Sequence, residues 1–341
     1  MNEATRALKE TSIEMNTEAT TKKTVTIVVP VYNEAENIPH FAAAVDEAMA
    51  GLPYDYEILF VDDGSREESR EVLRKTAAAD LHVRALYLSR NYGHQAALTC
   101  GIDNADGDAV VTMDGDMQHP PALLPKLLAL WEQGYDVVQT IRQTTEGVSA
   151  FKRLTSKYYY KALNLISEVP VQPGGSDFRL MDRQAVLALR QYREHDRFIR
   201  GIVGAMGFRQ VQVPFVAPER YAGTSKFSLK KMAKFALDGI LGNSILPLRI
   251  SFYIGLVSLL LSFALFGHVL FETFEGDTVP GWSTIVIVMA FFGGTQLMVL
   301  GVLGEYIGHI FREVKGRPLY LVDKSAGHLT NERQTTYNTG R

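Results

Sequence analysis

Cysteine is almost absent from this sequence, since Cys100 is the single cysteine among 341 residues. An intrachain disulfide framework and a cysteine-rich zinc site are therefore excluded. No histidines are spaced as His-x-x-x-His or His-Glu-x-x-His, so a histidine zinc site is not indicated either. An excess of one charge is also lacking, because 35 Lys and Arg residues against 38 Asp and Glu residues leave a net charge of -3. Without a basic field to attract phosphate backbones, nucleic acid is not an expected partner.

The first 23 residues contain no apolar segment and mix acidic with basic side chains. They resemble neither a signal peptide nor a membrane span, so we expect nothing in them to carry the following residues across a membrane. Too little apolar surface is present to offset the entropy lost on ordering. Residues 1–23 are therefore predicted to form a flexible polar tail.

From Thr24 onward, short apolar runs alternate with helical patterns. The apolar runs predict buried strands at Val25–Val31, Glu57–Val61, Val83–Leu88 and Ala109–Met113. The helical patterns predict helices at Asn37–Met49, Glu67–Ala79, Gln95–Asn104 and Ala122–Gln133. This alternation is typical of an α/β fold with a mostly parallel sheet. Such sheets bind ligands at the carboxyl ends of their strands.

Polar clusters follow three of the predicted strands, at Tyr32-Asn33-Glu34, Asp62-Asp63-Gly64-Ser65 and Asp114-Gly115-Asp116. Because the strands are parallel, we expect these clusters to share one edge of the sheet. Two carboxylates flanking a glycine suit a hard cation such as Mg²⁺ or Mn²⁺ that also binds substrate phosphates. Taken alone, such a motif is more often a solvated acidic turn. Its position beside the other two clusters favours a metal site.

Two apolar runs without charged residues, Ile250–Phe271 and Ser283–Leu303, dominate the second half of the chain. Each is about 20 residues long, which is enough to cross a hydrocarbon core. Basic residues lie outside the pair and acidic residues between its members, so both flanks are predicted to be cytoplasmic. The alternative is a pair of buried helices in a soluble domain. Residues 227–249, with lysines among apolar positions, predict an amphipathic helix, either at the membrane interface or in a core.

Several longer motifs extend the pattern. They are Val28-Val29-Pro30-Val31-Tyr32-Asn33-Glu34, Val61-Asp62-Asp63-Gly64-Ser65, Arg90-Asn91-Tyr92-Gly93, Met113-Asp114-Gly115-Asp116-Met117-Gln118-His119-Pro120-Pro121, Gly134-Tyr135-Asp136-Val137-Val138, Asp177-Phe178-Arg179-Leu180, Glu219-Arg220-Tyr221-Ala222-Gly223-Thr224-Ser225-Lys226 and Leu303-Gly304-Glu305-Tyr306-Ile307-Gly308. Together they resemble family 2 glycosyltransferases. The match is best to polyprenyl-phosphate glycosyltransferases, a subgroup that includes bactoprenol glucosyltransferases, aminoarabinose transferases and dolichol-phosphate mannose synthases. The resemblance runs from about Thr24 to Asp323.

This resemblance implies a Rossmann-like GT-A domain over residues 24–226. It further implies an amphipathic segment over 227–249, a two-helix transmembrane hairpin over 250–310 and a cytoplasmic tail over 311–341. Nucleotide-sugar contacts are implied for Pro30, Tyr32, Glu34, Asp62, Asp63 and Asp114. Divalent metal contacts are implied for Asp114, Asp116 and Gln118. Pro30 and Tyr32 alternatively shape the turn that follows the strand, and Asp63 alternatively belongs to a helix cap.

The implied acceptor is undecaprenyl phosphate or a related polyprenyl phosphate, an anion that must approach an anionic donor. Basic residues are needed there, and an Arg guanidinium grips phosphate with two parallel hydrogen bonds. The candidates for acceptor or diphosphate binding are Arg142, Lys152, Arg200, Arg220, Ser225 and Lys226, with Arg153 and Arg197 as weaker ones. Asp116, Asp177 and Arg142 are the candidates for catalysis. Asp177 orients the acceptor or accepts a proton, or alternatively only holds Arg179.

The predicted activity is inverting transfer of one hexose, with glucose and a UDP donor favoured by the resemblance, to a polyprenyl phosphate for cell-envelope glycan modification. The enzyme is expected in a bacterial cytoplasmic membrane, with its catalytic domain and both termini cytoplasmic, and as a homotetramer. A processive polysaccharide synthase is a second hypothesis, against which stands the lack of a Gln-x-x-Arg-Trp motif. A non-catalytic nucleotide-binding membrane scaffold is a third.

Overall fold

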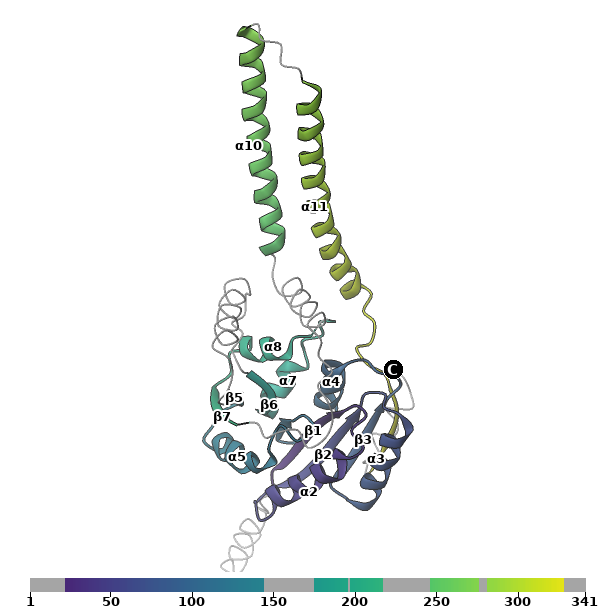
Figure 1. Ribbon diagram of the computed structural model, residues 1–341. Coiled ribbons are helices and arrows are strands. Elements are labelled where there is room, and N and C mark those ends of the chain that lie inside the picture. The colour runs from purple at the N-terminus through teal and green to yellow at the C-terminus, as the bar shows by residue number, and fades with distance from the viewer. Residues whose placement is uncertain (1–21, 144–174, 196, 217–245, 276–280, 328–341) are drawn as a thin grey trace, which may run out of the picture.

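The computed structural model describes residues 22–143, 175–195, 197–216, 246–275 and 281–327 (Figure 1). Its described strands form an eight-stranded sheet in the order β7-β5-β6-β4-β1-β2-β3-β8. The strands are β1 Thr24–Val31, β2 Asp55–Asp62, β3 Val83–Leu88, β4 Ala109–Thr112, β5 Val137–Arg142, β6 Gly175–Asp182, β7 Gln210–Phe215 and β8 Val322–Ala326. The helices of this domain are α2 Asn37–Met49, α3 Glu67–Ala79, α4 His94–Asn104, η1 Pro121–Leu123, α5 Leu124–Glu132, α7 Arg183–Leu189 and α8 Ile199–Ala205.

The strands and helices predicted before Gln133 are confirmed. Helices α2 and α3 have the predicted bounds, whereas the last predicted helix begins as the 3₁₀ turn η1 and continues as α5. Strand β1 pairs parallel with β2 and β4, β2 with β3, and β5 with β7. Antiparallel pairing joins β3 to β8, and β6 to both β4 and β5. The prediction of an α/β fold with a mostly parallel sheet is therefore confirmed.

Helices cover both faces of the sheet, because successive side chains of a strand point to opposite faces. On β1, Ile27 and Val29 pack into the core below α2, α3 and α5, while Val28 packs into the core below α4, α7 and α8. All three side chains are fully buried. Such two-sided burial explains why the strand reads as a continuous apolar run instead of an alternating one.

Strand pairing determines which loops meet at the functional edge. Strands β1, β2, β3 and β4 run in the same direction, so the turns that follow them lie at one edge of the sheet. Strand β6 runs against β4, with Thr112 opposite Arg179. The beginning of β6, which carries Ser176 and Asp177, therefore lies beside the turn after β4.

Strand β8 was not predicted. It lies within the segment 311–341 that the sequence indicated as a tail, and it pairs antiparallel with the outer strand β3. Tyr320 anchors the segment before it, because its hydroxyl donates to Asp103 Oδ2 of α4 at 2.9 Å. The amide of Ser89 also donates to Leu321 O at 3.0 Å. The chain thus returns to the sheet after the helices that follow β7 in sequence.

The two apolar runs form long helices, α10 Leu246–Glu275 and α11 Trp282–Val314, which lie antiparallel and extend away from the sheet (Figure 1). Large apolar side chains are exposed on both, including Phe252 at 68% and Leu297 at 71%. Among the residues that the structure describes, no helix meets the length and apolarity needed to span a membrane. The predicted transmembrane hairpin is thus not confirmed. The predicted amphipathic helix at 227–249 lies outside the described residues up to position 245.

Candidate active site

The turns after β1 and β2 hold each other through hydrogen bonds. The Asn33 N–H donates to Ser65 Oγ at 2.8 Å, and the Arg66 N–H donates to Asn33 Oδ1 at 2.9 Å. Asn33 has a φ of 55°, in the left-handed region that few residues other than glycine adopt. Tyr32, next to it, is 42% exposed. The two turns therefore form one unit that fixes a strained backbone and leaves the Tyr32 ring accessible.

Asp62 and Asp63 are both buried in this unit. Asp62 Oδ2 accepts a hydrogen bond from Arg70 Nε at 2.9 Å. Asp63 accepts the N–H of Tyr92 at 2.7 Å on one oxygen and the N–H of Gly93 at 2.9 Å on the other. Burial raises the pKa of Asp63, the two N–H donors lower it, and the charge of Asp62 adds to the increase. Both carboxylates hold neighbouring elements of the site in place.

Gly64 allows the loop after β3 to approach this turn. Its φ is 70°, and a Cβ at this position would lie 2.4 Å from Arg90 C and 2.5 Å from Asn91 N. Only glycine fits such a close approach of two backbones without a shift. The loop that leads into α4 is therefore packed directly against the turn after β2.

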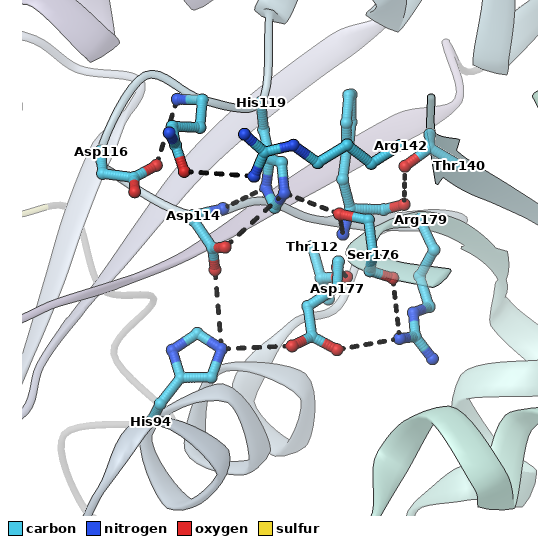
Figure 2. Close-up of polar contacts among 12 residues, drawn as sticks. His94, Thr112, Asp114, Asp116, His119, Thr140, Arg142, Ser176, Asp177 and Arg179 are labelled. Atoms are coloured by element: carbon cyan, nitrogen blue, oxygen red, sulfur yellow. Dashed lines mark hydrogen bonds and ion pairs between the residues drawn. The ribbon is translucent and has the colours of Figure 1, made fainter. Parts of the chain in front are cut away.

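The Asp114-Gly115-Asp116 turn follows β4 and faces the beginning of β6 (Figure 2). The Gln118 N–H donates to Asp116 Oδ1 at 3.1 Å. Arg142 Nη1, at the end of β5, lies 3.5 Å from Gln118 Oε1. Met117 has a φ of 62°, so this turn is also strained. The structure thus brings Asp114, Asp116, Gln118 and Arg142 together.

The oxygen atoms of this turn fit a divalent cation. Asp114 Oδ1 is shielded from solvent and has no hydrogen-bond partner among the described residues. Two carboxylates and an amide oxygen are the hard donors that Mg²⁺ and Mn²⁺ prefer. A different group of potential metal ligands also occurs in the described part of the chain. The ligand atoms of Asp46, Asp80 and His82 lie within 4.8 Å of one another. That set lies at the amino ends of β2 and β3, at the opposite edge of the sheet.

Asp177 is the centre of a buried charge cluster on β6. Arg200 of α8 donates to both of its oxygens, from Nε at 2.9 Å and from Nη2 at 2.8 Å. Arg179 Nη2 donates to Asp177 Oδ1 at 3.0 Å, and the Thr112 hydroxyl donates to Asp177 O at 2.5 Å. Burial alone raises the pKa of Asp177, but hydrogen bonds from His94 and Arg200 and the charges of Arg200 and Arg179 hold it well below its usual value. Asp177 is therefore ionised at neutral pH.

His94, the first residue of α4, connects the two acidic groups. Its Nε2 lies 3.5 Å from Asp114 Oδ1 and 3.5 Å from Asp177 Oδ2. Burial lowers the pKa of His94, but the hydrogen bond to Asp177 and the charges of Asp114 and Asp177 raise it above its usual value. No functional role was predicted for His94 from the sequence. The preceding Arg90-Asn91-Tyr92-Gly93 motif marked its neighbourhood, although nothing in the sequence indicated which strand ends the imidazole would contact.

His119 and Ser176 join the turn after β4 to the beginning of β6. His119 is 6% exposed and Ser176 is 7% exposed, and His119 Nε2 lies 2.6 Å from Ser176 Oγ (Figure 2). Arg179, fully buried beside them, retains Nε and Nη1 atoms without hydrogen-bond partners in the described residues. Burial lowers the pKa of Arg179 to about 10, against the charge of Asp177, so the guanidinium stays protonated at neutral pH.

The remaining predicted residues are placed as follows. Pro30 is buried in β1, where it pairs with Val61, and Glu34 Oε2 accepts from Asn37 Nδ2 at 2.5 Å. Arg197 is buried and donates to Thr99 Oγ1 at 3.2 Å, so it belongs to the packing of α4. The predicted contacts at Lys152, Arg153, Arg220, Ser225 and Lys226 lie outside the described residues.

Comparison with known proteins relates this arrangement to a family. Residues 26–190 match the model of Glycosyl transferase family 2. The chain is 40% identical over 308 residues to the uncharacterized glycosyltransferase YkcC of Bacillus subtilis, covering 90% of this chain and 95% of that protein. It is 39% identical over 302 residues to the SfII prophage-derived bactoprenol glucosyl transferase of Shigella flexneri, covering 88% of this chain and 98% of that protein.

The chain belongs to glycosyl transferase family 2. As a member of this family it is a glycosyltransferase, and its α/β domain has the mostly parallel sheet expected of the GT-A type that the resemblance implied. The predicted family and its polyprenyl-phosphate subgroup are confirmed, because relatives named bactoprenol glucosyl transferase match along nearly their whole length. A solved mannosyltransferase of Pyrobaculum calidifontis, in complex with GDP-Man and Mn²⁺, has 17% identity and a TM-score of 0.47 over 84% of this chain and 88% of that one.

Proposed function

We propose that this glycosyltransferase moves a single hexose, with glucose favoured, from a nucleotide sugar to the phosphate of a polyprenyl phosphate. One observation carries the proposal: the oxygen-rich turn at Asp114–Gln118 and the Arg200–Asp177 pair lie at the same edge, linked by His94. A site of this kind offers oxygen ligands for a cation that binds the donor diphosphate, next to guanidinium groups for an anionic acceptor. The relatives named bactoprenol glucosyl transferase support the lipid acceptor and the glucose.

The donor side is assigned to Asp114, Asp116 and Gln118, which would hold Mg²⁺ or Mn²⁺. When bound, the cation would neutralise the charge that grows on the leaving nucleoside diphosphate. Arg142, next to Gln118, adds a fixed positive charge on the same side. The buried Asp62 and Asp63 orient the loops that face the nucleotide, and the exposed Tyr32 ring offers a surface on which a base stacks. A UDP sugar is the favoured donor.

The acceptor side is assigned to Arg200, whose side chain is 44% exposed although Asp177 fixes its position. A phosphate monoester has a second pKa near 6, so its attacking oxygen is already largely deprotonated at neutral pH. A strong general base is then unnecessary. Asp177 is poorly suited to that role, because its low pKa makes it a weak proton acceptor and its oxygens already bind two arginines. Asp177 therefore holds Arg200, and direct attack on the anomeric carbon inverts its configuration.

Location at a membrane is part of the same proposal. Helices α10 and α11 expose large apolar side chains along their length, including Phe252, Val257, Leu260 and Leu297. Exposed apolar surface of this extent is typical of groups covered by lipid or by another chain. We propose that lipid covers these helices at the cytoplasmic face of a bacterial membrane, with both termini cytoplasmic. A homotetramer belongs to the same proposal, and light scattering of the detergent-solubilised protein tests it.

The decisive experiment incubates the purified protein with undecaprenyl phosphate, Mn²⁺ and a panel of radiolabelled nucleotide sugars, followed by lipid extraction. We expect label from one donor in the lipid fraction, one sugar per lipid, and loss of transfer on adding a chelator. The anomeric configuration of the product, measured by NMR, tests inversion. Extension to chains of several sugars would favour a processive synthase, and absence of transfer from every donor would favour a nucleotide-binding scaffold.

A further inference from the structure

His119 lies in the loop between β4 and η1, close behind the Asp114–Asp116 turn. Its ring stacks on Phe178 of β6 with centroids 5.3 Å apart and an interplanar angle of 27°. Phe215 of β7 meets the same ring edge-on at 6.0 Å. The His119 side chain is 8% exposed. Packing against two aromatic rings from two strands therefore fixes its orientation.

Both ring nitrogens of His119 are engaged with groups of the protein. Nδ1 lies 2.8 Å from the backbone nitrogen of Asp114, which is a donor, so Nδ1 accepts this hydrogen bond. A ring nitrogen that accepts carries no proton, and a neutral imidazole then carries its proton on Nε2. Nε2 consequently donates to Ser176 Oγ at 2.6 Å. The same Oγ accepts the Phe178 N–H at 3.2 Å.

These bonds exclude two ordinary roles for a histidine beside a metal turn. A metal ligand needs a ring nitrogen with a free lone pair, whereas Nδ1 is occupied by an N–H donor and Nε2 is protonated. A general base needs an unprotonated nitrogen that reaches the substrate, and none is left. What remains is a rigid connection between the turn after β4 and the start of β6.

The connection closes a ring of contacts around the site (Figure 2). Asp114 bonds to His119, His119 to Ser176, and Ser176 is followed in the chain by Asp177. Asp177 contacts His94, and His94 contacts Asp114. One histidine thus joins the two sides from within the domain core, and the other joins them from the partly exposed side.

We propose that His119 is a positioning residue that sets the distance between the donor side at Asp114–Gln118 and the acceptor side at Asp177 and Arg200. This inference relies on the proposed function for the meaning of the two sides. Displacement at an anomeric carbon requires the attacking and leaving oxygens in line, and a misplacement of about 1 Å costs roughly a hundredfold in rate. Ser176 belongs to the same link, because its Oγ accepts the hydrogen bond from His119 Nε2.

The experiment compares His119→Phe, His119→Asn, Ser176→Ala and the double variant His119→Asn/Ser176→Ala. Phenylalanine keeps the stacking on Phe178 and removes both nitrogens, whereas asparagine keeps an acceptor near the position of Nδ1 and loses the reach to Ser176. We expect kcat to fall about a hundredfold in His119→Phe and about tenfold in each of the other single variants. The KM for the donor and the Mn²⁺ concentration for half-activation should change by less than about threefold, because alignment and not ground-state binding is lost.

The double variant tests whether the two residues act together. Because His119→Asn has already lost the bond to Ser176, the double variant should have the kcat of the worse single variant. Losses that multiply would overturn the proposal, as would wild-type kcat in His119→Phe. Thermal unfolding of each variant establishes that it is folded. If His119→Phe does not fold, the kcat values of His119→Asn, Ser176→Ala and the double variant alone decide whether the two residues act together.

A measurement without turnover separates this inference from the proposed function. Nitrogen-15 NMR of the imidazole in the full-length wild-type protein reports which ring nitrogen carries the proton. We expect the neutral form protonated on Nε2 at pH 7, and loss of the Nε2 hydrogen-bond shift in Ser176→Ala. A proton on Nδ1 would overturn the proposed link even in an active enzyme. Conversely, absence of sugar transfer with the expected tautomer would refute the proposed function and leave the link established.

Discussion

The two sides of the active site meet at one edge of the sheet, but they are bonded in opposite ways. On the donor side, the Asp114 side chain is 36% exposed, and its Oδ1 atom has no hydrogen-bond partner among the described residues, although His94 Nε2 lies 3.5 Å away. On the acceptor side, the Asp177 side chain is 6% exposed and binds Arg179, Arg200 and His94. One side keeps oxygen atoms for a ligand, whereas the other is complete without one.

This difference indicates that the Asp177 cluster contributes to the stability of the fold, whereas the Asp114–Gln118 turn serves mainly to bind a ligand. A buried carboxylate that lacks partners would be costly, so Asp177 is saturated by the protein itself. The Asp114 side chain is partly exposed, and its shielded Oδ1 lies 3.5 Å from His94 Nε2, so this turn holds its carboxylate with fewer protein contacts than Asp177 has. Variants on the donor side should reduce turnover with little effect on stability, and variants on the acceptor side should change both.

The largest expected effect follows from Asp116→Asn, which removes a charge from the proposed metal site. We expect kcat to fall about 10²- to 10³-fold at saturating Mn²⁺, because the charge on the leaving diphosphate is less well compensated. The free energy of unfolding should stay within about 0.5 kcal/mol of wild type, as for other partly exposed positions. Initial rates across a Mn²⁺ titration and urea unfolding supply the two measurements. Wild-type turnover would remove Asp116 from the metal site.

Asp46→Asn is the matched control. Asp46 belongs to the other described cluster of potential ligand atoms, at the opposite edge of the sheet. The same chemical change there should leave the rate and its Mn²⁺ dependence at wild-type values. A loss equal to that of Asp116→Asn would instead point to metal binding at the Asp46 edge.

Asp177→Asn should reduce the free energy of unfolding by about 3 kcal/mol, because it leaves two arginines in the cluster without their carboxylate. The KM for the polyprenyl phosphate should also rise, since Arg200 loses its bidentate partner. Urea unfolding and acceptor titrations measure the two effects. Unchanged stability together with lost turnover at saturating acceptor would favour a proton-accepting role instead.

The pH dependence of stability should reveal the same carboxylate. The folded pKa of Asp177 lies well below the unfolded value of about 4. The folded state then binds fewer protons than the unfolded state, so the stabilisation is complete above about pH 4 and is lost as the pH falls through the folded pKa. Unfolding free energies of wild type and Asp177→Asn should converge as the pH is lowered through this window. A constant difference would contradict the assignment.

The smallest expected effect is that of Tyr320→Phe, which lies away from both sides. The variant removes the hydroxyl that donates to Asp103 and should cost about 1 kcal/mol of unfolding free energy, measured with urea. Turnover at saturating substrates should remain at the wild-type value. A large loss of turnover would show that the return of the chain after α11 affects the site directly.

Elements with strong sequence patterns were predicted closely. The helix Asn37–Met49 has apolar side chains on one face and ends before a Gly-containing turn, and its bounds agree with α2. In contrast, β8 has the sequence Val-Asp-Lys-Ser-Ala, which is too polar to indicate a strand. Its conformation comes from pairing with β3, and such tertiary context outweighs intrinsic strand preference at a sheet edge.

The candidate site was predicted in its parts but not in its connections. Strand ends identified Asp62, Asp114 and their neighbours, because parallel strands present their carboxyl ends together. The links through His94 and His119 depend on β6 running against β4, and no local pattern indicated that pairing. A histidine also binds in two ways through two different nitrogens, and a sequence alone does not specify its partners.

The return of the chain through β8 has a consequence for biosynthesis. Strand β3 receives its outer partner only after α10 and α11 have been made, since β8 follows both helices in the sequence. During translation the N–H and C=O groups of that β3 edge therefore stay without their native strand while most of the chain emerges. Open strand edges pair readily with other chains, and contacts between distant segments form slowly. The nascent enzyme is thus exposed to aggregation at this edge of β3 until β8 is released from the ribosome.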